Sequence, residues 1–115
     1  MLSPNRFQFL NVEGELVKPV DWNSEAFSKL WLYNLHYFDD LNAEGAVERV
    51  DWHLGLIHRW IEENPPGTGN GWEPYPLSLR IINWIKWHLA GNELDSITSH
   101  SLAVQVRFLM CRLEY

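Results

Sequence analysis

The stretch NPPGTGNGWEPYPLSLRIINWIKWHLA, residues 64–90, carries the strongest structural signals in this chain of 115 residues. Its opening Asn-Pro-Pro ends the helical pattern before it, because proline lacks an amide hydrogen and disfavours helix in the preceding residue. A Gly- and Pro-rich loop follows, and the fixed φ of Pro76 suits the first position of a new helix. From Pro76 to Gly91 the residues are apolar almost all round, which predicts a largely buried helix.

Three further helical patterns surround this stretch. Apolar residues recur at three- and four-residue steps over 24–42, where a Ser or Asn can cap the start, and again over 46–63. A last pattern starts near Asp95 or Ser96, with a stripe made by Leu102, Val106, Leu109 and Leu113. Four helices with short links predict an all-α fold of antiparallel helical hairpins.

The first part of the chain has a different character. Phe7 and Phe9 alternate with polar residues, and the Glu-Gly pair ending at Gly14 indicates a turn. We therefore expect a short extended strip or β-hairpin over 1–22 that packs on a helical domain over 23–115.

Composition excludes several classes of protein. The net charge of −6, with nine Lys and Arg against fifteen Asp and Glu and no basic stripe, argues against nucleic-acid binding. A single cysteine, Cys111, excludes an internal disulfide, and its apolar neighbours predict a buried thiol. The N-terminus lacks a signal-peptide pattern, and no apolar run is long enough to span a bilayer. Most of the seven tryptophans are expected to fill the core.

The segment LWLYNLHYFDDL, residues 30–41, is dense in polar and aromatic groups. On a helix, Tyr33 and Tyr37 lie on one face, as do His36 and Asp40, each pair four residues apart. A histidine beside carboxylates can act as a tuned acid or base, but the same spacing also suits a solvated pair at a helix end. A metal site would need a third ligand, which the pattern does not supply.

The segment GWEPYPLSLR, residues 71–80, is the second such region. Trp72 and Tyr75 offer flat faces to a sugar ring, and Glu73 and Arg80 offer a carboxylate and a forked donor suited to a uronate or sulfate. The alternative is structural: Glu73 and Arg80 pair with each other, and Trp72 fills the core beneath the loop. The sequence leaves both interpretations open.

The remaining histidines carry little functional signal. His53 and His58 lie five residues apart on one helix and do not share a face. His88 falls near a helix C-terminus, where a partial positive charge is favourable. His100 is expected to be exposed.

Four segments together resemble a known family: FQFLN at 7–11, LWLYNLHYFDDL at 30–41, IEENPPGTGNGWEPYPLSLRIINWIKW at 61–87 and RFLMCRLEY at 107–115. They are similar to the N-terminal part of the helical domain of heparinase II/III-like polysaccharide lyases, over nearly the whole chain. The resemblance implies an incomplete (α/α) toroid, followed in full-length members by a β-sandwich domain. These enzymes, often exported by bacteria, cleave uronic-acid polysaccharides such as glycosaminoglycans by β-elimination.

The resemblance also implies roles for individual residues. The family's catalytic Asn, Tyr and His are expected beyond Tyr115, so we assign no catalytic residue, metal or cofactor and expect a truncated segment that is inactive alone. The matching motif positions are expected to line or buttress a cleft for acidic polysaccharide, and they are Tyr33, Asn34, His36, Tyr37, Trp72, Glu73, Tyr75 and Arg80. Two alternatives remain: a carbohydrate-binding module without activity, and a purely structural helical module.

Overall fold

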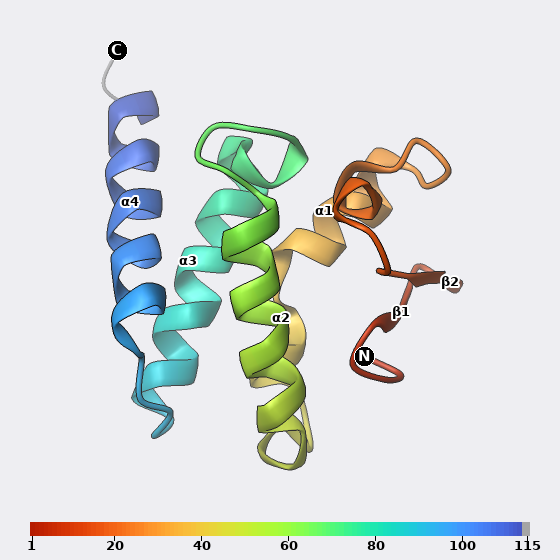
Figure 1. Ribbon diagram of the computed structural model, residues 1–115, viewed down its shortest axis with the longest axis horizontal. Coiled ribbons are helices and arrows are strands. Elements are labelled where there is room, and N and C mark those ends of the chain that lie inside the picture. Colours follow the sequence, from red (N-terminus) through yellow and green to blue (C-terminus); the bar gives the residue numbers. More distant parts are fainter. Residues whose placement is uncertain (114–115) are drawn as a thin grey trace.

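The computed structural model describes residues 1–113, in which four α-helices and a two-stranded hairpin surround one core (Figure 1). The elements are β1 (Arg6–Phe9), β2 (Val12–Glu15), α1 (Lys29–Tyr37), α2 (Val50–Glu63), α3 (Pro74–Leu89) and α4 (Ser96–Leu113). The successive helices α2, α3 and α4 alternate in direction, as antiparallel hairpins do. The predicted helical class and N-terminal hairpin are therefore confirmed. Glu114 and Tyr115, which end the RFLMCRLEY motif, lie outside the described residues.

The turn of the hairpin is not at the predicted Glu13-Gly14 pair, which lies within β2, but at two residues with left-handed backbone, Leu10 (φ 54°) and Asn11 (φ 63°). Such a two-residue turn matches the twist of paired strands. In the resulting register Phe7 lies opposite Gly14, and a Cβ on Gly14 would approach the Trp31 ring to 2.6 Å. Glycine at this position therefore lets the hairpin lie directly on α1.

The first helix is shorter than the 24–42 predicted from periodicity. It begins after Ser28, whose hydroxyl accepts a hydrogen bond from the amide three residues on, and it ends at Phe38, where the backbone is left-handed (φ 63°). Asn83 of α3 donates to the carbonyl of Tyr37 at 2.9 Å, so a tertiary contact satisfies the end of the helix. Periodicity alone does not reveal such a stop.

Helix α3 differs from its prediction at both its start and its surface. It begins at Pro74, two residues before the expected Pro76, and closes before Gly91 (φ 115°) as predicted. The expectation of burial on all sides is wrong, because α1 and α4 cover two sides of α3 and leave a third open. The exposed apolar residues on the open side are Ile82, Ile85 and Leu89.

The other two helices also depart from their predicted faces. The helix predicted over 46–63 begins only at Val50, because a 3-10 turn over Ala46–Arg49 precedes it and leaves the apolar Val47 exposed. Helix α4 starts as predicted, with Asp95 Oδ1 accepting from the Thr98 amide at 2.7 Å. The fully inward residues of α4 are polar, namely Thr98, Ser101 and Gln105, whereas Leu102, Val106 and Leu109 are only half-buried and Leu113 is exposed. Cys111 is exposed, which corrects the prediction of a buried thiol.

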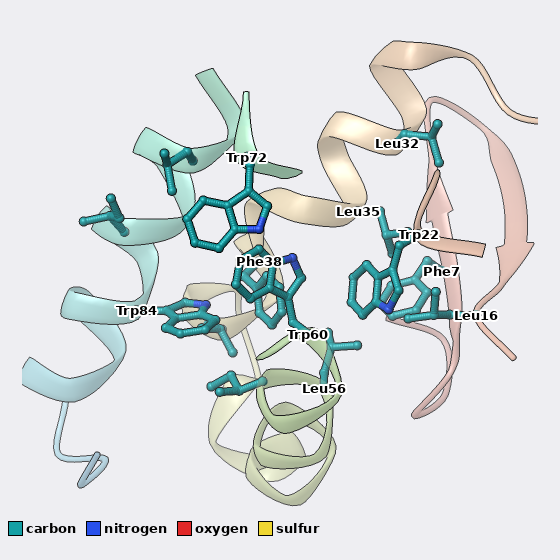
Figure 2. Close-up of a cluster of buried hydrophobic side chains, with 14 of the residues drawn as sticks. Phe7, Leu16, Trp22, Leu32, Leu35, Phe38, Leu56, Trp60, Trp72 and Trp84 are labelled. Atoms are coloured by element: carbon teal, nitrogen blue, oxygen red, sulfur yellow. The ribbon is translucent and has the colours of Figure 1, made fainter. Parts of the chain in front are cut away.

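Tryptophan dominates the core, as predicted. Figure 2 shows Trp22, Trp60, Trp72 and Trp84 gathered around Phe38, between α1, α2 and α3. The rings of Trp60 and Trp84 meet edge to face, with centroids 5.8 Å apart. Such aromatic pairs contribute packing with a defined geometry. This core is the support on which the predicted functional residues stand.

Candidate functional site

Seven of the eight predicted site residues separate into an outer group and a group deeper in the core. Four lie together where α1 meets the start of α3, and we call them, with Lys29, the outer patch: Lys29, Tyr33, Tyr37, Glu73 and Tyr75. Three lie beneath, in the core: His36, Trp72 and Arg80. Asn34 stands apart and donates to the Leu30 carbonyl at 2.9 Å, where it borders a small cavity beside the hairpin.

The centre of the outer patch is the carboxylate of Glu73. The Tyr33 hydroxyl donates to Glu73 Oε1 at 2.7 Å, and Lys29 Nζ lies 2.9 Å from the same oxygen. Lys29 also sits 5.6 Å from the centre of the Tyr33 ring. Lys29 was not among the predicted residues, although its spacing of four from Tyr33 places both on one helix face and could have indicated it.

The charges of the outer patch follow from these contacts. Partial burial raises the pKa of Glu73, but hydrogen bonds from Lys29 and Tyr33 outweigh it and hold this pKa below its ordinary value. Burial, together with the hydrogen bond to Glu73, raises the pKa of Tyr33. The hydrogen bond to Glu73 raises the pKa of Lys29. At neutral pH the patch therefore presents a carboxylate, an ammonium and a neutral phenol.

The two other tyrosines add an aromatic surface. The rings of Tyr37 and Tyr75 lie 5.8 Å apart, tilted by 57°. Tyr37 is buried, whereas Tyr75 in the first turn of α3 is 62% exposed. Tyr75 is thus the predicted aromatic residue with a face open to a ligand, and Trp72 is not.

His36 is a buried structural histidine. Its Nε2 donates to the Trp22 carbonyl at 2.8 Å, and its Nδ1 accepts from Trp60 Nε1 at 3.0 Å, which together define the neutral tautomer. Burial, assisted by the nearby charge of Arg80, lowers the pKa of His36 to about 3. His36 is therefore uncharged at neutral pH and available to no substrate.

The predicted pairing of His36 with the carboxylates after it is wrong. The helix ends at Phe38, so Asp39 and Asp40 do not continue the helical face of His36. Asp39 instead accepts from Asn83 Nδ2 at 2.9 Å, and Asp40 turns toward α2. The acid–base interpretation of this segment has no geometric basis.

Arg80 is fully buried and does not pair with Glu73, the partner that the structural alternative suggested. Its guanidinium stacks 3.8 Å from the centre of the Trp60 ring, Nε donates to Gln105 Oε1 at 2.8 Å and Nη1 donates to the His36 carbonyl at 3.2 Å. Burial lowers the pKa of Arg80 well below its ordinary value. From its place on α3, Arg80 contacts α1, α2 and α4 inside the core. It therefore supports the outer patch from below and does not contact a ligand there.

Trp72 is likewise a buttress. Its indole donates to the Asn64 carbonyl at 3.1 Å and packs between Trp60 and Phe108. The adjacent Gly71 leaves room for His36, since a Cβ there would collide with the His36 ring. Of the two interpretations of Trp72, the structure confirms the core role.

One polar cluster was missed from the sequence. The Asp40 carboxylate accepts from His53 Nε2 at 2.7 Å, from Arg49 Nε at 2.8 Å and from the Met1 amino group at 3.0 Å. Partial burial raises the pKa of Asp40, but these hydrogen bonds lower it well below its usual range. The contacts fasten the start of α2 to the end of α1. No sequence signal connects these residues, because a turn brings them together.

The described residues offer no group of three His, Cys, Asp or Glu side chains arranged to hold a metal ion. Over residues 1–113, every helix is too short or too polar to cross a membrane. Comparison with known proteins yields no matching family model, curated protein or solved structure.

Proposed function

We propose that this chain forms part of the helical (α/α) toroid of a heparinase II/III-like polysaccharide lyase, and that its outer patch contacts an acidic polysaccharide. The motif resemblance supports this proposal, and so do successive helices that alternate in direction, the unit from which a toroid is assembled. The proposal gives the segment a substrate-contacting role. It assigns no proton transfer of the β-elimination reaction to the residues described.

One observation carries the proposal: the two resembling motifs meet at the surface. Tyr33 of YNLHYFD and Glu73 of GWEPYP are 40 positions apart, yet their side chains share a 2.7 Å hydrogen bond. Beneath them, Arg80 of the second motif donates to the His36 carbonyl of the first. Residues of both motifs therefore form one small surface and pack beneath it.

The groups on this surface suit a charged sugar. The exposed Tyr75 ring can stack on the C–H face of a pyranose, and Glu73 can accept from a sugar hydroxyl. The Lys29 ammonium can bind a carboxylate or sulfate oxygen, and the Tyr33 oxygen, whose proton is donated to Glu73, can accept from a sugar hydroxyl. Since the chain carries a net charge of −6, such binding depends on this local cluster and should weaken as salt screens it.

The alternative is a carbohydrate-binding module that does not cleave its ligand, and the exposed Tyr75 favours it equally. Lyase activity releases an unsaturated uronate, which is detected by its ultraviolet absorbance. Polymer binding by this chain without such release supports a binding role. Turnover by this chain alone would refute the inactive-alone expectation and require a proton-transfer set within it.

Calorimetric titration with heparin, chondroitin sulfate and alginate tests the proposal. We expect Tyr75→Ala to weaken binding about tenfold, because a stacked aromatic ring contributes roughly 1 kcal/mol beyond its buried area. The matched control is Leu89→Ala, which removes another exposed apolar side chain of α3 far from the outer patch. If Tyr75→Ala binds like the wild type, or if Leu89→Ala loses as much, the outer patch is not the binding surface.

A further inference from the structure

The donors of the outer patch already hold an anionic group, which is the carboxylate of Glu73. Its Oε1 atom accepts from the Tyr33 hydroxyl at 2.7 Å and lies 2.9 Å from Lys29 Nζ. A single oxygen atom therefore takes both donors. A uronate carboxylate or a sulfate carries the same sign of charge and the same type of acceptor, so it competes with Glu73 for the ammonium.

A second cation lies near the same carboxylate, on the last turn of α4. The guanidinium carbon of Arg112 lies over the Phe108 ring, 5.8 Å from its centre, and Phe108 packs edge to face on Trp72, the residue before Glu73. Partial burial raises the pKa of Glu73, while the hydrogen bonds it accepts and the charge of Arg112 lower it. Glu73 therefore offsets positive charge that α1 and α4 both bring to the outer patch.

The Glu73 side chain has room to leave this position. It is 34% exposed, so a displaced carboxylate stays in contact with water. Glu73 also immediately precedes α3, and its side chain makes no capping hydrogen bond to that helix. A carboxylate beside a helix N-terminus is favoured by the helix dipole. Displacement of Glu73 from Lys29 therefore buries no charge and leaves the carboxylate ionised.

We propose that Glu73 occupies the anion position of the outer patch and that a carboxylate or sulfate group of the polysaccharide takes its place. The incoming group then accepts from Lys29 Nζ and from the Tyr33 hydroxyl, whose proton turns from Glu73 to the ligand. A neutral sugar does not displace Glu73, because a hydroxyl oxygen binds an ammonium less strongly than a carboxylate does. Glu73 is thus a specificity-determining residue that favours anionic polymers. The inference rests on the proposed function, because the displacing group belongs to the bound polysaccharide.

Calorimetric titration of Glu73→Gln with heparin tests the exchange. The glutamine retains an oxygen for the Tyr33 hydroxyl but lacks the charge that competes for Lys29. We expect heparin affinity to rise about two- to fivefold at low ionic strength, which is the range of an exposed ion pair, and the gain to shrink with added salt. The near-ultraviolet circular dichroism of the Trp-rich core verifies that each variant is folded.

Glu13→Gln is the matched control. It changes the net charge by the same amount and also removes a carboxylate from an exposed ion pair, with Arg6 at 3.1 Å, but it lies on β2, outside the outer patch. Arg6 keeps a second carboxylate partner in Glu15. Because salt screens distant charges, heparin affinity should change by less than about 1.5-fold in this variant.

A double variant distinguishes competition for Lys29 from a general loss of repulsion. Lys29→Met removes the ammonium and retains the aliphatic stem. In that background, adding Glu73→Gln should raise heparin affinity by less than about 1.5-fold, because the two effects are coupled through one contact. The inference is overturned if Glu73→Gln binds heparin no more tightly than the wild type, or if its gain persists in full without Lys29.

These outcomes separate the exchange from the proposed function. If Tyr75→Ala loses polymer binding while Glu73→Gln gains none, the proposed function stands and the exchange is wrong. If heparin binds Glu73→Gln in a manner that requires Lys29 but does not bind the wild type, the exchange stands and the proposed function of the natural outer patch fails. If heparin binds neither chain, both are wrong.

Discussion

The guanidinium of Arg80 lies 3.8 Å from the centre of the Trp60 ring, fully buried and with neutral hydrogen-bond partners. A buried cation without a carboxylate partner is costly, and here the indole face and two oxygen acceptors offset part of that cost, while Nη2 has no hydrogen-bond partner among the described residues. The contact joins α3 to α2, while Gln105 joins the same guanidinium to α4. The outer patch therefore depends on a buried residue that no ligand contacts.

Substitutions of Arg80 should distinguish the contribution of its packing to stability from the contribution of its charge and hydrogen bonds. We expect Arg80→Ala to lower the free energy of unfolding by about 3–5 kcal/mol, because it opens a cavity and leaves two acceptors without donors. Arg80→Met retains most of the volume and should cost less. Adding Gln105→Leu to Arg80→Met should recover part of the loss by removing one stranded acceptor. Urea denaturation followed by fluorescence measures all three, and equal losses for Ala and Met would contradict this account.

Two glycines should respond to alanine in opposite directions. A Cβ on Gly71 would collide with the buried His36 ring, so Gly71→Ala should lower the free energy of unfolding by about 3 kcal/mol. Gly55 lies on an exposed part of α2 with nothing within 4 Å of an added Cβ. Gly55→Ala should therefore raise the free energy of unfolding by about 1 kcal/mol, because alanine favours helix more than glycine does. Thermal melts of both variants test the pair, and a stable Gly71→Ala would show that His36 can move.

Burial of neutral His36 predicts a pH dependence of stability. Its pKa falls from 6.5 to about 3 on folding, so between these values the unfolded chain binds more protons than the folded one. Stability is then complete above pH 6.5 and declines by up to about 1.4 kcal/mol per pH unit as the pH falls toward 3.

Urea midpoints between pH 4.5 and pH 7 measure this decline. Folding lowers the pKa of Asp40 from its ordinary value of 3.8, so the contribution of Asp40 to stability depends on pH mainly below this value. Asp40 therefore does not account for a slope between pH 4.5 and pH 7. His36→Gln should flatten the slope, whereas His100→Gln, at an exposed site, should leave it unchanged. A slope that persists in His36→Gln would assign the effect to another group.

The hydrogen bond between Tyr33 and Glu73 should matter more for binding than for folding. The pair is half-exposed, so Tyr33→Phe should change the free energy of unfolding by less than about 1 kcal/mol. The same variant loses the phenol oxygen that can accept from a sugar hydroxyl, and it leaves Glu73 without one of its donors, so polymer affinity should fall. Denaturation and calorimetry on one preparation compare the two effects. A large loss of stability would instead assign Tyr33 a structural role like that of the buried residues His36, Trp72 and Arg80.

Local patterns predicted much of the fold. The Asn-Pro-Pro break, the proline-started third helix and the cap before α4 all depend on residues within a few positions of one another. The early end of α1 before Phe38 could not be predicted, because the side chain that satisfies the carbonyl at this end belongs to Asn83, which is distant in sequence. The open side of α3 was missed for a related reason: apolar character does not say which neighbours are present to cover it.

For the candidate site, the sequence by itself indicated two motifs rich in Tyr, Trp, Glu, His and Arg, and it did not indicate Lys29. Only the tertiary structure decided which of them face outward, because burial depends on contacts between helices and not on spacing within one helix. Tyr33, Glu73 and Tyr75 reach the surface, while His36, Trp72 and Arg80 are enclosed. A buried charge such as Arg80 can exist only where distant segments supply its acceptors, and the chain order of those segments does not disclose that they meet.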